Sequence, residues 1–178
     1  MMMKITKILA ILTALSGIGI VNASAGSHPS PVQVTAVLDL HSVSVESRKK
    51  NLPILLVFSA SDCSFCELLE NEILKPMILS GDYYDRVIIR KVVMDDDSTL
   101  RDFNGETISM EDFSDHYDIF VTPTMLFLDP AGLELSERLL GINTVEMFGG
   151  RVDRAIELSL EKLRPDAENL ARNTGAVM

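Results

Sequence analysis

The chain of 178 residues contains two cysteines, Cys63 and Cys66, which are separated by two residues. This spacing lets both sulfur atoms lie on one helical turn, close enough to form a disulfide bond. The pair follows the apolar run 52–58 and begins a segment with helical spacing. A sulfur at a helix start meets unpaired N–H groups and the positive end of the helix dipole, and both stabilise a thiolate. The residues therefore predict thiol–disulfide exchange, with Cys63 as the attacking residue and the more buried Cys66 as the resolving one.

Residues 1–25 have the composition of a signal peptide. The segment begins with Lys4 and Lys7, continues with an apolar run over residues 8–21, and ends with a small-x-small sequence that predicts cleavage near Ala25. The apolar run is shorter than the roughly 20 residues that a membrane-spanning helix needs, which favours a cleaved signal over an anchor. We expect an exported protein without a membrane span in its mature chain, and export places the cysteines in an oxidising compartment.

The chain is acidic. It has 26 Asp and Glu against 16 Lys and Arg, and its formal charge of -10 becomes -12 when a signal peptide carrying two lysines and no acids is removed. Such a charge disfavours nucleic acid and anionic lipid as partners. Residues 26–178 suffice for one domain with its own hydrophobic core. Such a core needs no disulfide for stability, so the cysteines are available for chemistry.

Hydrophobic periodicity predicts an α/β fold. Helices are expected over residues 36–50, from the cysteines to about residue 78, over residues 110–117 after a cap in Ser109-Met110-Glu111-Asp112, and from a cap at Asn143 with Glu146 to Leu163. Strands are expected over residues 54–59, 86–94, 124–129 and 133–140, the last two as an antiparallel hairpin. This order implies a mixed central sheet of about four to five strands with helices on both faces, and it places Cys63 at the carboxyl end of a strand.

Local signals refine this scheme. Pro76 is expected to kink or end the helix that the cysteines open, and Asn104-Gly105 predicts a hairpin turn in an insert. The chain is divided into a flexible leader over residues 26–35, one domain over residues 36–163 and a tail over residues 164–178.

Three separated features resemble the thioredoxin fold over roughly residues 36–163. They are the sequence Cys63-Ser64-Phe65-Cys66 after an apolar strand, Val121-Thr122-Pro123-Thr124 before another strand, and Gly141 just before the last helix. The Asn104-Gly105 insert and the stretch 122–132 look most like SoxW-type exported thioredoxins and related periplasmic domains. The resemblance implies a periplasmic protein that reduces or exchanges disulfides in protein substrates, without a cofactor, and receives electrons from a membrane or periplasmic donor.

The resemblance also implies roles for the proline segment. The proline that corresponds to Pro123 is cis in this family and faces the cysteine pair. It leaves the backbone of Thr122 free to bind an extended substrate as an added strand.

The sequence departs from many thioredoxins at two positions. Asp62 replaces the tryptophan before the first cysteine, and Val57 replaces the buried acid six residues before it. Lys91 falls near the lysine that accompanies this acid in the family, so it is either a relay partner or a surface charge. Glu67 is the candidate to relay protons to Cys66 in place of the missing acid.

Charge near the cysteines predicts the direction of exchange. Asp62 and Glu67 place negative charge beside the pair, which disfavours a thiolate and makes the protein a better reductant. The expected protein is a reductase or exchanger rather than a strong oxidant. Apart from the candidate relay by Glu67, the paired acids Glu67 and Glu70 are interpreted as solvated helix surface. The run Asp95-Asp96-Asp97 is interpreted as a turn that ends a strand.

Other functions remain open. A zinc site would need ligands from His28, His41 and His116, which lack paired ligand spacing, so no metal is expected. A non-catalytic binding module with a structural disulfide is a second alternative, although a bridge across two residues adds little stability. Further alternatives are an oxidase that inserts disulfides and a reductant dedicated to one partner.

Overall fold

The computed structural model describes residues 32–95, 97–142 and 144–164. The predicted signal peptide, the leader up to residue 31, Asn143 and the tail from residue 165 lie outside the described residues. Within the described residues, none of the helices combines the length and the apolar character that crossing a membrane requires.

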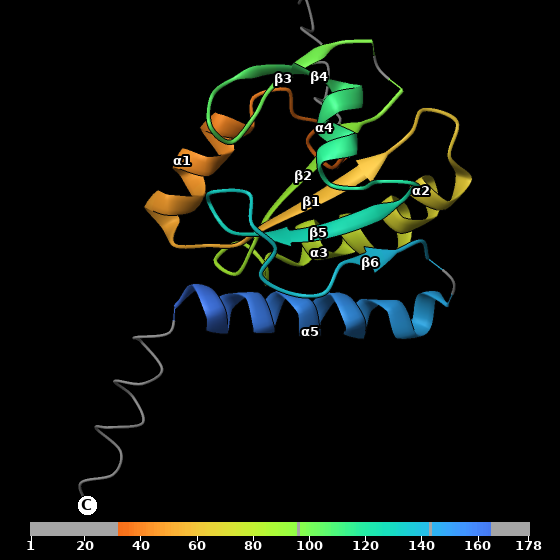
Figure 1. Cartoon of the computed structure of the whole chain (residues 1–178). Helices are drawn as coiled ribbons and strands as arrows, with labels where there is room; N and C mark the ends of the chain where they lie inside the picture. Colours follow the sequence, from red (N-terminus) through yellow and green to blue (C-terminus); the bar gives the residue numbers. More distant parts are fainter. Residues whose placement is uncertain (1–31, 96, 143, 165–178) are drawn as a thin grey trace, which may run out of the picture. The chain divides into compact units, whose positions relative to one another are not determined.

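The domain is built from a four-stranded sheet, a separate hairpin and helices (Figure 1). In chain order the elements are α1 (Leu40–Lys50), β1 (Ile54–Ser59), α2 (Ser64–Leu69), the π-helical turn η1 (Glu70–Leu74), α3 (Lys75–Ser80), β2 (Ile88–Val93), β3 (Thr99–Arg101), β4 (Thr107–Ser109), α4 (Met110–His116), β5 (Thr124–Leu128), β6 (Leu139–Leu140) and α5 (Val145–Leu163). The sheet order is β2-β1-β5-β6, in which β1 and β2 are parallel and β5 is antiparallel to both β1 and β6. The predicted mixed sheet is confirmed.

Alternate side chains of β1 feed two separate cores, one on each face of the sheet. Leu55 and Val57 pack with side chains from α2, η1, α3 and α5. Ile54, Leu56 and Phe58 pack with side chains from α1 and α4. Figure 1 shows these two groups of helices on opposite faces of the sheet. A strand buried on both faces needs a continuous apolar run, which is why the predicted and observed bounds of β1 agree.

The first helix begins four residues later than predicted. Asp39 ends the preceding extended segment, because its carboxylate accepts a hydrogen bond from the N–H of Ser42 and caps α1. Before it, Thr35 and Val37 make backbone hydrogen bonds with Lys91 along the outer edge of β2. Val34 is buried in the core. The packed part of the chain therefore includes residues that precede the predicted domain boundary at residue 36.

Pro76 does not end the helix that starts after Cys63. The helix continues through α3 to Ser80, with Pro76 in the first turn of α3. The π-helical turn η1 lies just before it. A proline has no N–H to donate and its ring clashes with the carbonyl four residues earlier, so a wider turn at this point accommodates it.

The last strand is much shorter than predicted. Only Leu139 and Leu140 form β6, although Leu135 also donates a backbone hydrogen bond to Phe127 of β5. Between these two pairings, the guanidinium of Arg138 reaches the carbonyl oxygen of Tyr117 at 2.7 Å. The chain leaves the sheet there, while its antiparallel pairing with β5 is as predicted.

Two predicted local signals are confirmed. The hairpin of β3 and β4 turns at Asn104-Gly105, where Gly105 has φ of 92°. The side chain of Ser109 caps α4 by accepting a hydrogen bond from the N–H of Asp112 at 3.0 Å. The structure places the cap of α5 at Thr144, one residue after the predicted cap.

Candidate active site

The two cysteines form a disulfide at the start of α2, just beyond the carboxyl end of β1. Their sulfur atoms are 2.11 Å apart. Cys63 is the capping residue of α2, and its Sγ accepts a hydrogen bond from the N–H of Cys66 at 3.1 Å. The first sulfur therefore lies where the free N–H groups of a helix stabilise negative charge.

The two sulfurs differ in their access to solvent. Cys63 is partly exposed, whereas Cys66 has 8% of its surface exposed and belongs to the buried side chains. A disulfide of another protein can approach Cys63 more easily than Cys66. The order of attack itself, with Cys63 first, stays a prediction.

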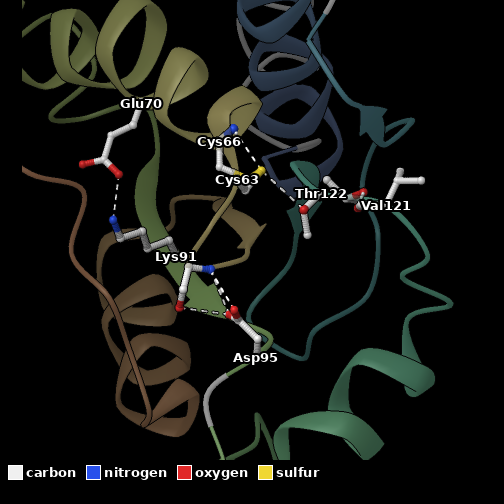
Figure 2. Close-up of a disulfide and its surroundings, with 9 residues drawn as sticks. Cys63, Cys66, Glu70, Lys91, Asp95, Val121 and Thr122 are labelled. Atoms are coloured by element: carbon white, nitrogen blue, oxygen red, sulfur yellow. Dashed lines mark hydrogen bonds and ion pairs between the residues drawn. A yellow bond between two sulfur atoms is a disulfide. The ribbon is translucent and has the colours of Figure 1, made fainter.

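The proline segment lies directly against Cys63 (Figure 2). The Thr122–Pro123 peptide bond is cis, and the hydroxyl of Thr122 lies 3.5 Å from the Sγ of Cys63, in position to donate a hydrogen bond to it. The N–H of Gly141 donates to the carbonyl of Pro123 at 2.8 Å and holds the segment to the end of β6. Within the described part of the chain, the N–H and carbonyl of Thr122 form no backbone hydrogen bond. They are available to an added strand.

Exposed apolar side chains flank the cysteine pair and the proline segment. Phe65 lies between the two cysteines, and Phe120 and Val121 precede Thr122. All three are exposed, Phe120 to 85%. Grouped apolar side chains on a surface are typical of sites that bind protein.

Asp95 joins the loop before Cys63 to the end of β2. Its two carboxylate oxygens accept the N–H of Ser61 at 2.9 and 3.0 Å, and one also accepts the Ser61 hydroxyl at 3.2 Å. The interpretation of residues 95–97 as a turn that ends a strand did not include this contact. Because Ser61 is two residues before Cys63, Asp95 holds the loop that leads to the first cysteine.

Glu70 was interpreted as solvated helix surface, and the structure contradicts this. Its carboxylate forms an ion pair with Lys91 at 2.6 Å (Figure 2). It also accepts the N–H of Val34 at 3.4 Å. Burial acts to raise the pKa of Glu70, but the Lys91 ammonium, the Val34 N–H and the more distant charge of Lys75 outweigh it and lower that pKa.

Glu67 and Lys91, the two predicted relay residues, are not brought together. Lys91 pairs with Glu70 instead of Glu67, and it is therefore more than an isolated surface charge. It is also the register partner of Val57, the residue at the position of the missing acid. Glu67 is exposed. A carboxylate thus accompanies Lys91 after all, but it comes from the helix rather than from β1.

Comparison with known proteins shows the family of this chain. Residues 41–156, more than half of the chain, match the model of a family described as thioredoxin-like domain. The chain belongs to this thioredoxin-like family. No curated protein matches the sequence.

Solved thioredoxins resemble the thioredoxin-like domain. A poplar thioredoxin h mutant is 20% identical, with 79% of this chain and 95% of that chain covered and a TM-score of 0.52. A thioredoxin of Nicotiana alata is 22% identical, covering 73% and 98% of the two chains with a TM-score of 0.47. The thioredoxin of Fasciola hepatica is 18% identical, covering 70% and 97% with a TM-score of 0.45. At these identities the poplar structure supports the fold.

The two histidines of the thioredoxin-like domain, His41 and His116, contact groups other than the cysteines. The Nδ1 of His41 lies 3.2 Å from the carbonyl oxygen of Phe103, and the ring of His116 packs edge-on against Tyr117. His28 lies outside the described residues. Over residues 32–95, 97–142 and 144–164, no three His, Cys, Asp or Glu side chains are grouped so that they could hold a metal ion.

The sequence contained a signal for Glu70 but none for the bonding of Asp95. Glu70 is four residues after Cys66, on the same face of the helix, and Lys91 lacked its usual acidic partner. Matching Glu70 with Lys91 on this basis would have predicted their ion pair. Asp95 contacts a residue 34 positions away, and such a contact depends on the parallel pairing of β1 with β2.

Proposed function

We propose that this protein is an exported thiol–disulfide oxidoreductase that reduces or exchanges disulfides in protein substrates. The observation that carries the proposal is the position of Cys63. Its sulfur caps a helix, is partly exposed, and lies 3.5 Å from the hydroxyl of Thr122 in the cis-proline segment. A structural disulfide would need none of these features.

The reaction begins with the reduced pair. The Cys63 thiolate attacks one sulfur of the substrate disulfide, forms a mixed disulfide and releases the first substrate thiolate. The thiolate of Cys66 then attacks the Sγ of Cys63 and releases the second one. The substrate gains two electrons and the protein is left with the Cys63–Cys66 disulfide, which an electron donor in the membrane or periplasm reduces again.

Neighbouring groups assist these steps. The backbone of Thr122 and the cis Pro123 segment hold the substrate chain as an added strand, and the Thr122 hydroxyl stabilises negative charge on Cys63. Cys66 must lose a proton before it attacks. Glu67 on α2 and the Lys91–Glu70 ion pair are the groups that we propose to relay it.

The sequence supports the rest of the proposal. Residues 1–25 act as a signal peptide, residues 26–35 as a leader whose last residues, Val34 and Thr35, pack on the domain, residues 36–163 as the thioredoxin-like domain and residues 164–178 as a tail. The protein works in the periplasm and belongs among the SoxW-type thioredoxins. The acids Asp62 and Glu67 beside the cysteines support reduction over oxidation, and equilibration with glutathione tests this direction. A potential near that of the strong oxidant DsbA, about -120 mV, would contradict it.

Insulin reduction and trapping test the proposed function. The purified protein should accelerate insulin reduction by dithiothreitol, and the Cys63→Ser variant should not. Cys66→Ser should retain substrate as a mixed disulfide through Cys63, because the resolving thiol is gone. Trapping by Cys63→Ser instead would reverse the two roles. A wild-type protein that exchanges with neither insulin nor glutathione would be a non-catalytic binding module.

A further inference from the structure

Two contacts attach the loop before Cys63 to the end of β2. One is a backbone hydrogen bond from the N–H of Met94 to the carbonyl of Ser59 at 2.8 Å. The other is the Asp95 carboxylate, which accepts both the N–H and the hydroxyl of Ser61. The loop that carries the attacking sulfur is thus fixed at its beginning by the neighbouring strand.

We propose that Asp95 is a positioning residue of the redox site, which holds this loop and sets the reduction potential of the cysteine pair. The proposal rests on the proposed function. Asp95 is exposed, but its hydrogen bonds to Ser61 hold the carboxylate against the loop that leads to Cys63. Its negative charge disfavours the Cys63 thiolate and so destabilises the reduced form relative to the disulfide.

The other charged groups near the pair differ from Asp95 in how they are held. Asp62 and Glu67 are exposed like Asp95, but among the contacts of the described residues their carboxylates form no hydrogen bond or ion pair. The charges of Lys91 and Glu70 largely offset each other in their ion pair. Asp95 carries a negative charge and also accepts hydrogen bonds from the loop before Cys63. We therefore expect it to affect the reduction potential both by holding the loop and by its charge.

Two substitutions separate these effects. Asp95→Asn retains the side-chain volume and one oxygen that can accept the Ser61 N–H, but it removes the charge. Asp95→Ala removes both the charge and the hydrogen bonds. Asp97→Asn is the matched control, since Asp97 is an exposed acid two residues away whose carboxylate has no hydrogen bond or ion pair among the contacts of the described residues.

The experiment equilibrates each purified full-length variant with glutathione. In the reaction, the dithiol and oxidised glutathione give the protein disulfide and two reduced glutathione molecules. For Asp95→Asn we expect the equilibrium constant for oxidation to fall about threefold, which is a rise in potential of about 14 mV at 29.6 mV per tenfold. Asp97→Asn should change the equilibrium constant less than 1.5-fold.

A second measurement follows the rate of Cys63 alkylation against pH in the Cys66→Ser background. Adding Asp95→Asn should move the midpoint of this profile to lower pH, which a purely structural role would not do. An Asp95→Asn protein with the wild-type equilibrium constant would overturn the proposal. An equal shift in Asp97→Asn would overturn it too, because the effect would then come from general surface charge. Failure of the wild-type protein to exchange with glutathione would refute the proposed function itself.

Discussion

Replacing Glu70 with glutamine tests the ion pair beneath the cysteine helix. The change preserves size and one oxygen for the Val34 N–H, but it removes the charge that faces Lys91 at 2.6 Å. The ammonium of Lys91 then loses its partner while it remains partly buried. The expected result is a less stable protein whose disulfide still forms.

The structure sets the size of this effect. A hydrogen bond to a charged group contributes about 1.5–3 kcal/mol, and solvent screening reduces it because the Glu70 and Lys91 side chains are 17% and 24% exposed. We therefore expect Glu70→Gln to lower the free energy of unfolding by about 1–2 kcal/mol at pH 7. The folded pKa of Glu70 lies below its ordinary value of 4.5. Its contribution is thus fully present above pH 4.5 and is lost as the pH falls through the folded pKa.

Urea unfolding of wild type and variant, at pH 7 and at several acidic pH values, measures this contribution. The control is Glu72→Gln, which removes an exposed acid from the same helical turn and should change stability by less than about 0.5 kcal/mol. The reasoning fails if Glu70→Gln and Glu72→Gln have the same free energy of unfolding at pH 7. It also fails if the difference from wild type persists once the pH lies below the folded pKa.

Two further substitutions test contacts at the other end of the sheet, away from the cysteines. Gly132→Ala should lower the free energy of unfolding by about 2–4 kcal/mol, because Gly132 has φ of +87° and the new Cβ would lie 2.6 Å from the ring of Phe103. The control is Gly81→Ala, which has φ of +78° but nothing within 4 Å of the new Cβ. It should cost only about 1–2 kcal/mol in the same thermal or urea unfolding experiment. Tyr83→Phe should cost about 1 kcal/mol, because it removes the 2.7 Å hydrogen bond from the Tyr83 hydroxyl to Asp153. Burial, followed by this hydrogen bond, raises the pKa of Tyr83 from 10.0 to about 12, so the stability difference should be present below pH 10 and should narrow as the pH rises through 12. A difference that is unchanged across this range would contradict the assignment.

The parts of the fold that could be predicted are those set by local sequence. The continuous apolar run of β1, the Asn104-Gly105 turn and the Ser109 cap each follow from neighbouring residues. The parts that could not be predicted depend on distant partners. The apolar residues from Val37 to Val45 mix helical and alternating spacing, so their pattern did not show where the helix begins. Residues 36–39 pair instead with Lys91 and Arg101, which come from β2 and β3.

The candidate site divides in the same way. The spacing of Cys63 and Cys66 predicted a disulfide at a helix start, because two sulfurs one turn apart can bond in that conformation. The relay was harder to predict, because the side chain that meets Lys91 is selected by the packing of the helix on the sheet. That packing brings Glu70 to Lys91 and leaves Glu67 in solvent.

The margins of the sheet have a consequence for self-association. One outer strand, β6, has only two residues, and the other, β2, is partly covered by backbone hydrogen bonds from Thr35 and Val37. In the described parts of the chain, neither margin offers a long row of unpaired backbone groups on which a second copy could stack. The chain can therefore keep the backbone of Thr122 open to foreign polypeptides without inviting polymerisation along its own strands.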